Sequence, residues 1–212
     1  MNLSRYQHLV IRDPAPAPTS SELAHLTSLL GADLPDSFLK YLKVANGGYL
    51  EYSIEIESGS EIESVSFCGL LSTNASAGEA FEHHIALWRK NIQMPLGILP
   101  FAHDGGGSTV FLDLTSAGRG RVVAYVHGLP EWAGKRADDR TLELASSFDK
   151  YVAKLQVDRE ALLDHLAYDV TTIAELEDIR EFIELAIPTW QDDSEMSGAI
   201  LQTQQAVSTN SR

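Results

Sequence analysis

The sequence has few cysteines and no long apolar run, and both shortages restrict where the protein can work. Cys68 is the single cysteine among 212 residues, so no internal disulfide can form, whereas secreted proteins of this size commonly carry paired cysteines. Apolar stretches such as Leu96–Ala102 are interrupted by glycine and proline and fall far short of the roughly 18 residues that cross a bilayer. The first ten residues also lack the apolar block of a signal peptide. We therefore expect a cytoplasmic protein with no membrane span.

Positive charge is also scarce. The chain carries 16 lysines and arginines against 30 aspartates and glutamates, for a net charge of −14. Such a field repels phosphate backbones and anionic lipid headgroups, so neither nucleic acid nor a membrane is an expected partner. No lysine or arginine occurs from Val44 to Trp88, although this stretch contains Glu51, Glu55, Glu57, Glu61, Glu63, Glu79 and Glu82. A run of this kind is either a solvated surface or a surface that attracts a basic protein electrostatically.

The remaining composition is that of an ordinary globular protein with one packed domain and extensions, because 44% of the residues are hydrophobic and 22% are charged. Residues 1–18 are predicted to be an extended lead-in, since proline occupies every second position near its end, and regular structure is expected to begin after it. Thr19 and Glu22 then have capping-box spacing and predict a first helix that stops at Gly31.

The following segments alternate between helical and strand periodicity. Leu34-Pro35 opens a second helix that ends at Asn46-Gly47-Gly48, and the alternation of apolar and acidic residues over 50–57 predicts a strand with one acidic face. The other predicted elements are a strand at 61–67, a helix at 77–92, strands at 98–102, 109–114 and 121–126, a long loop at 128–140, and helices at 141–155, 158–167 and 172–187. This order favours an α+β fold.

The expected organisation is an α+β domain at 19–157, an acidic helical extension at 158–190 and a polar tail at 191–212. The tail is rich in serine, threonine, glutamine and asparagine, a composition typical of a mobile chain end.

Three motifs in this order resemble the SUKH superfamily. They are Leu34-Pro35 with Phe38 and Asn46-Gly47-Gly48, then Leu99-Pro100-Phe101-Ala102-His103-Asp104-Gly105-Gly106-Gly107, then Leu144-Ala145-Ser146-Ser147-Phe148. The superfamily is named from a yeast cell-wall-synthesis regulator and from immunity proteins, and the resemblance spans roughly 20–155. It implies a twisted, mainly antiparallel sheet with helices packed around it. It also implies binding of a partner protein, commonly a toxin such as a nuclease or deaminase, and provides no catalytic, metal or cofactor residues to transfer.

Chemical alternatives have weaker support in the sequence. The glycines at 105–107 are followed by neither a lysine nor a helix, which argues against a phosphate loop, and they suit a strand reversal. A hydrolase would need Ser108, with His103 or His127 and Asp113, or a cleft formed by His103, Asp104 and Asp113, but the Gly-x-Ser-x-Gly elbow is absent. His83 and His84 are adjacent and so point about 100° apart on a helix, which is unsuitable for a shared metal. Cys68 is expected to be a buried, inert thiol.

Together with the SUKH resemblance, the sequence predicts a non-catalytic immunity protein, without cofactor or metal, that binds and occludes a cognate bacterial toxin, expected to be a basic nuclease. The acidic strand residues Glu51, Glu55, Glu57, Glu61 and Glu63 are the expected contact surface, and Trp132, in the long loop, is a candidate anchor. The acidic helices after Asp158 are the alternative surface. They would suit a regulatory or scaffolding module of the same family, and the sequence does not fix the oligomeric state.

Overall fold

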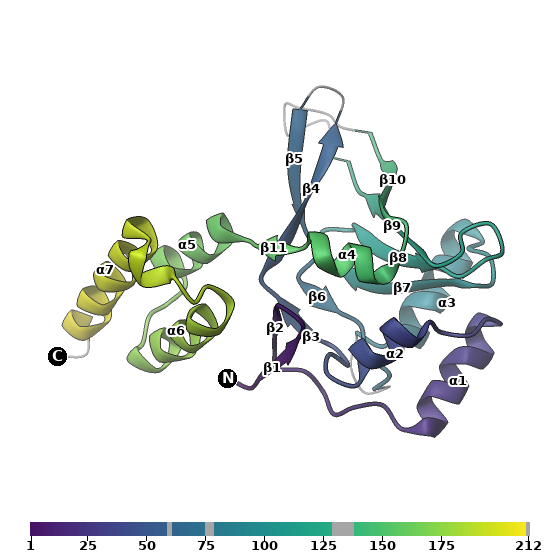
Figure 1. Ribbon diagram of the computed structural model, residues 1–212, viewed down its shortest axis with the longest axis horizontal. Coiled ribbons are helices and arrows are strands. Elements are labelled where there is room, and N and C mark those ends of the chain that lie inside the picture. Colours follow the sequence, from purple (N-terminus) through teal and green to yellow (C-terminus); the bar gives the residue numbers. More distant parts are fainter. Residues whose placement is uncertain (59–60, 75–78, 129–137, 211–212) are drawn as a thin grey trace.

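Two antiparallel sheets form the framework of the protein (Figure 1). The computed structural model describes residues 1–58, 61–74, 79–128 and 138–210. The large sheet has eight strands in the order β1-β2-β3-β6-β7-β8-β9-β10, and the small sheet has the order β11-β4-β5. The strands are β1 (Leu3–Tyr6), β2 (Leu9–Arg12), β3 (Gly48–Leu50), β4 (Tyr52–Ser58), β5 (Glu61–Ser66), β6 (Gly69–Leu70), β7 (Ile98–His103), β8 (Thr109–Asp113), β9 (Arg121–Val126), β10 (Arg140–Ala145) and β11 (Gln156–Val157). The predicted α+β class is confirmed.

Helices surround this framework and continue beyond it. They are α1 (Ser20–Leu30), α2 (Asp36–Leu42), α3 (Phe81–Ile92), α4 (Phe148–Lys154), α5 (Arg159–Tyr168), α6 (Ile173–Ala186) and α7 (Ser194–Asn210), with a 3₁₀ turn, η2 (Trp190–Asp192). The predicted capping boxes are confirmed, because Thr19 with Glu22 begins α1 and Thr172 with Glu175 begins α6. Within the described part of the chain, no helix is both long enough and apolar enough to cross a membrane.

An aromatic cluster joins the helices to the large sheet. Phe38 of α2 and Phe148 of α4 pack edge to face, with ring centroids 5.0 Å apart, and both contact Phe101 of β7. α3 packs on the sheet through Trp88, whose ring lies 5.1 Å from Phe111 and 5.3 Å from Tyr125. Two separate aromatic contacts therefore fix β7, β8 and β9, and the glycine loop connects β7 to β8.

The N-terminal segment differs from its prediction. Residues 1–12 are not an extended lead-in, because β1 and β2 form a hairpin that joins the large sheet through β3. Leu9, Val10 and Ile11 have no exposed surface, and burying three apolar side chains favours a strand in the sheet over a solvated lead-in. The proline segment after this hairpin contains no helix, as predicted, and Ala15 bridges Asn46.

The predicted helix at 141–155 is only half correct. Arg140–Ala145 is strand β10, paired with β9, and the helix begins at Phe148 after the N-cap Ser147. Leu142 and Leu144 fit a strand period of two as well as the helical pattern, and pairing with β9 satisfies the backbone hydrogen bonds of this segment in the sheet.

The prediction of a polar tail after residue 190 is wrong, because Ser194–Asn210 forms helix α7. Met196, Ile200 and Val207 recur at helical spacing and are buried, so this polar segment contributes an apolar stripe to a bundle with α5 and α6. The bundle lies to one side of the sheets, and α6 contacts β2 (Figure 1).

Candidate functional site

The β4–β5 hairpin carries the predicted acidic residues and projects from the body of the protein (Figure 1). Its register places Glu55 opposite Ser64 and Ile56 opposite Glu63. Directly opposed residues share a face of a sheet, so Glu55 and Glu63 lie on different faces. Glu55 is exposed, while Glu63 is half-buried on the face that also carries buried Ile54 and Ile56. The glutamates thus do not form one continuous acidic face.

Arginines from other strands compensate two of these glutamates. Arg12 of β2 forms an ion pair with Glu51, and Arg140 of β10 forms one with Glu63. Neither pair was predicted from the sequence. Both arginines are distant in the sequence from the stretch Val44 to Trp88, and only the pairing of the strands brings them to its glutamates. The side chains of Glu57 and Glu61, and all of Trp132, lie outside the described part of the structure.

A cleft of about 280 Å³ lies at the base of the hairpin, between β5 and the ends of β9 and β10. It is lined by Glu63, Val65, Ser66, Phe67, Asp104, Ser108, Val126, His127, Gly128, Asp138 and Arg140. Three carboxylates and one guanidinium give this lining a net negative charge, while Val65 and Phe67 supply apolar wall. An acidic cleft with an apolar wall suits a lysine or arginine side chain, whose aliphatic stem packs while its charged head pairs.

The glycine loop beside the cleft is occupied by its own hydrogen bonds. Oδ1 of Asp104 accepts the N–H groups of Gly106 and Ser108, at 2.7 and 2.9 Å. The Gly105 N–H donates to Nδ1 of His103 at 3.1 Å. Because these three donors are already used within the loop, they are not available to cradle a phosphate, in agreement with the sequence analysis.

The nominated hydrolase residues do not converge on one point. Oγ of Ser108 accepts the His127 N–H at 3.1 Å, and the His103 imidazole bonds with Glu79 instead. Asp113, at the far end of β8, accepts from Thr115 and forms an ion pair with Arg121. Ser108, His103 and Asp113 therefore each serve a separate local structure.

The Cys68 thiol does not favour nucleophilic chemistry either. Partial burial raises the pKa of Cys68, and the negative charge of Glu51 raises it further. A raised pKa keeps the thiol protonated at neutral pH, whereas a nucleophilic cysteine needs its thiolate form.

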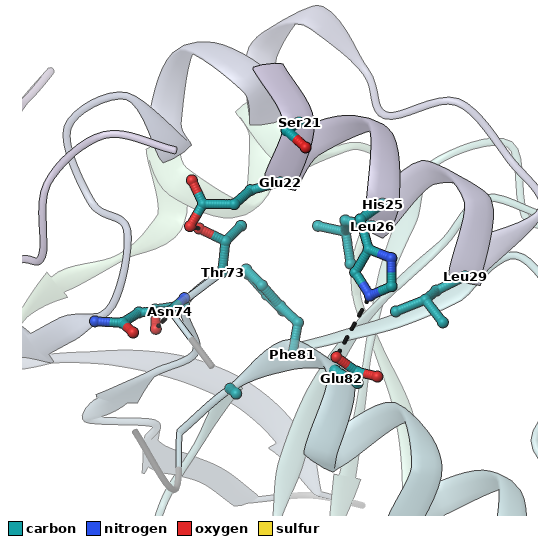
Figure 2. A pocket seen from close by; sticks show the side chains of 11 residues that line it. Ser21, Glu22, His25, Leu26, Leu29, Thr73, Asn74, Phe81 and Glu82 are labelled. Atoms are coloured by element: carbon teal, nitrogen blue, oxygen red, sulfur yellow. Dashed lines mark hydrogen bonds and ion pairs between the residues drawn. The ribbon is translucent and has the colours of Figure 1, made fainter. Parts of the chain in front are cut away.

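A second, larger pocket of about 530 Å³ separates α1 from the start of α3. Figure 2 shows its rim, where Nε2 of His25 lies 3.4 Å from the Glu82 carboxylate. Glu22 closes the capping box of α1, and Thr73 bonds with Asn46. Glu22 and Thr73 thus stabilise the fold around the pocket, and the His25 and Glu82 side chains are largely exposed at 59% and 60%.

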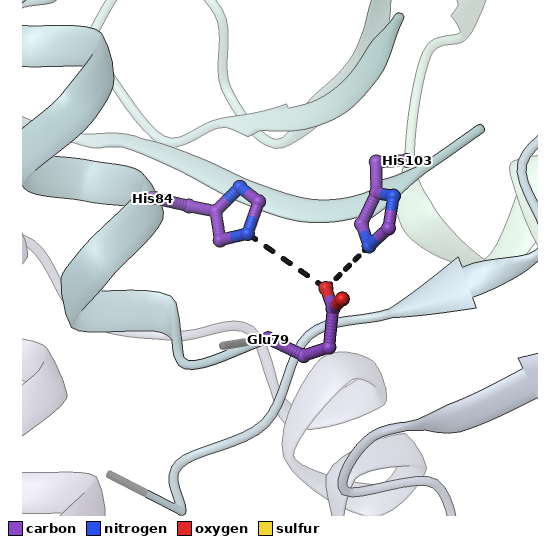
Figure 3. Close-up of side chains that lie close together, drawn as sticks. All are labelled: Glu79, His84 and His103. Atoms are coloured by element: carbon purple, nitrogen blue, oxygen red, sulfur yellow. Dashed lines mark hydrogen bonds and ion pairs between the residues drawn. The ribbon is translucent and has the colours of Figure 1, made fainter. Parts of the chain in front are cut away.

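A cluster of Glu79, His84 and His103 lies at the end of β7 (Figure 3). Nε2 of His84 lies 3.8 Å from Oε2 of Glu79, and Nε2 of His103 hydrogen-bonds with the same oxygen. In the sequence, His83 is the only histidine adjacent to His84, and neither Glu79 nor His103 stands at a metal-site spacing from it. Strand pairing and the turn before α3 bring the three residues together, and no sequence spacing predicts that arrangement.

The chain is an α+β protein, because helices pack on an antiparallel sheet and a helical bundle extends it. Its main acidic feature is the cleft beside the β4–β5 hairpin. The model of the SMI1 / KNR4 family (SUKH-1) matches residues 17–154, and the chain belongs to this family. The match covers α1 through α4 and excludes both the N-terminal hairpin and the helices α5, α6 and α7. No curated protein and no solved structure matches the chain.

Proposed function

We propose that this protein is a non-catalytic immunity protein that binds and occludes a cognate toxin with a basic surface, such as a nuclease. The observation that carries the proposal is the acidic cleft beside the β4–β5 hairpin, which Glu63, Asp104 and Asp138 line together with apolar Val65 and Phe67. Membership of the SMI1 / KNR4 family supports an interaction role, and the net charge of −14 favours a cationic partner over a nucleic acid.

Within this proposal, different parts of the hairpin act at different stages of binding. Glu55 is exposed on the outer face of β4, where a charge mainly accelerates the encounter with an oppositely charged partner. Glu63 is 40% exposed and paired with Arg140. A partner cation entering the cleft would compete with Arg140 for this carboxylate. Glu63 therefore acts in the docked complex, and the positive charge of Arg140 reduces the negative charge of the cleft.

The alternative is a regulatory or scaffolding module that uses the acidic helices. Glu177, Glu181 and Glu184 follow one another at helical spacing on α6, and all three are exposed. Glu184 is bonded to Arg180 within the same helix, which reduces the charge of this stripe. The cleft is a more enclosed site for a side chain, and we therefore favour it as the contact surface.

Co-expression with the product of the adjacent gene tests the proposal. The expected result is a stable complex that co-purifies, together with rescue of cells from that product's toxicity. The rescue should be lost when Glu63 and Asp104 are changed to lysine and retained when Glu177 and Glu181 are changed to lysine. If only the α6 changes abolish binding, the alternative surface is correct. If the adjacent product is neither toxic nor bound, the immunity proposal is wrong.

A further inference from the structure

Two imidazoles and one carboxylate are directed at a common point beside β7. The three ligand atoms of Glu79, His84 and His103 lie within 4.8 Å of one another. The two rings are stacked, with centroids 5.5 Å apart and an interplanar angle of 16°, so both Nε2 atoms face the Glu79 carboxylate (Figure 3). Among the described residues, this is the one group of three or more potential ligands. None of the three residues lines the acidic cleft.

We propose that Glu79, His84 and His103 bind a divalent transition-metal ion, with Zn²⁺ the expected ion. Two histidine nitrogens and one carboxylate oxygen are a ligand set that Zn²⁺ accepts, with water or another donor in the fourth position. Imidazole ligands also select against Mg²⁺ and Ca²⁺, which favour oxygen. Zn²⁺ holds nitrogen and oxygen ligands at roughly 2.0–2.2 Å, and three ligand atoms within 4.8 Å of one another are close enough to share one ion.

The protein framework holds each ligand in place. The Glu79 carbonyl accepts the Ser72 N–H at 2.9 Å, which fixes the turn before α3 to the sheet side of the site. His84 lies in the first turns of α3, and His103 ends β7 opposite Gly69 of β6. A Cβ at Gly69 would lie 2.5 Å from Cε1 of His103. Glycine at this position therefore leaves space for the imidazole, and ligands on rigid elements need little reorganisation to bind.

Access and proton balance are also compatible with an ion. The His84 and His103 side chains are 16% and 19% exposed, while Glu79 is 47% exposed, so the site opens to solvent on the carboxylate side. Without an ion, Nδ1 of His103 accepts the Gly105 N–H, which places the ring proton on Nε2. Metal binding at Nε2 moves that proton to Nδ1, and the Gly105 N–H then turns away. A Cβ at Gly105 would meet nothing within 4 Å, and the wide φ and ψ range open to glycine allows this peptide to reorient.

The test uses the full-length chain without a histidine tag, stripped of metal by a chelator and titrated with ZnCl₂. Calorimetry should give one Zn²⁺ per chain, and Zn²⁺ should raise the melting temperature because an ion that binds the native state stabilises it. Changing Glu79→Gln or His84→Gln should weaken binding by more than about tenfold, the loss expected even for a partner that only orients a ligand. Binding should also shift the NMR signal of the Gly105 amide.

His83→Gln is the matched control, because His83 is exposed and adjacent to His84 in the same helix, with its ring roughly perpendicular to that of His84. The control should retain Zn²⁺ binding, and each variant should show the wild-type circular dichroism spectrum without metal. Failure of the wild type to bind Zn²⁺ overturns the proposal. So does equal loss of binding in His83→Gln and His84→Gln, or unchanged binding in both Glu79→Gln and His84→Gln.

Discussion

The ring of Tyr52 packs edge to face against the ring of Phe182, with centroids 6.4 Å apart. Tyr52 begins β4, the strand of the acidic hairpin, and Phe182 is fully buried in α6 of the C-terminal bundle. The Tyr52 hydroxyl also accepts the Val10 N–H and donates to the His8 carbonyl, at 3.0 and 3.1 Å. One side chain thus joins the N-terminal hairpin, the acidic hairpin and the C-terminal helices, and these parts should unfold together.

Truncating Phe182→Ala should lower the free energy of unfolding by about 3–5 kcal/mol, the usual loss for a fully buried phenylalanine. The reason is the cavity left between α6 and Tyr52. Urea unfolding measured at neutral pH provides the test. Leu185→Ala, on the same helix but 38% exposed, is the control and should lose about 1 kcal/mol or less. Equal losses would show that α6 does not dock through Phe182.

The stability of the C-terminal bundle should decrease in acid through Asp193. The Arg159 guanidinium binds both carboxylate oxygens of Asp193 and lowers its pKa from 3.8 to about 2. A lowered pKa in the folded state means that this contribution to stability is fully present above the unfolded value and is lost as pH falls through about 2.

Thermal unfolding of Asp193→Asn and the wild type at several pH values measures this contribution. The variant should melt at a lower temperature at pH 7, and the difference should shrink between about pH 4 and pH 2. A difference that does not change with pH would mean that the Asp193 charge is not what stabilises the bundle.

Gly198→Ala should stabilise the protein by about 0.5–1 kcal/mol, because alanine has the higher helix propensity in the middle of α7. A Cβ at Gly198 would meet nothing within 4 Å. Gly120→Ala is the matched control, since its surroundings are equally open but its φ is +85°. That change should destabilise by about 1–2 kcal/mol. If Gly198→Ala increases neither stability nor helix content by circular dichroism, α7 is not a stable helix in solution.

Charge reversal should distinguish the two acidic surfaces during association with the partner. Glu55→Lys should slow association several-fold at low salt and reduce the salt dependence of the rate, because screening then acts on a weaker attraction. Glu177→Lys makes the same charge change on α6 and should leave the rate nearly unchanged. Stopped-flow mixing over a range of salt concentrations is the measurement. The opposite pattern of rates would assign the encounter surface to the helices.

Local signals in the sequence predicted much of the fold. The capping boxes at Thr19 and Thr172 were identifiable because each involves residues three positions apart. Gly47 and Gly48 separate the second helix from the acidic strand in the sequence, and their φ values of +82° and +96° are left-handed backbone that glycine adopts without a Cβ penalty. The wrong assignments at Leu9–Ile11 and Thr141–Ala145 have a common cause. Short apolar segments become strands when a neighbouring strand pairs with them, and that neighbour is distant in the sequence.

The candidate sites were less predictable because their charges meet only in the folded state. The prediction of an acidic strand face did not include the ion pairs of Arg12 with Glu51 and of Arg140 with Glu63, in which each arginine comes from another strand. Glu79, His84 and His103 come together only because the turn before α3 lies next to the end of β7 in the folded protein. Sequence spacing predicts neighbours along one helix or strand, whereas both of these arrangements depend on sheet register and helix docking.

The contact between α6 and β2 has a consequence for how the chain is made. The segments on either side of the family match, at the two ends of the sequence, complete each other's packing. At synthesis rates of about 5–20 residues per second, Leu9, Val10 and Ile11 leave the ribosome on the order of ten seconds before α6 is available to cover them. Throughout this interval β2 can pair with β3 but lacks its cover from α6, so the apolar segment stays open to chaperones until α6 has been synthesised.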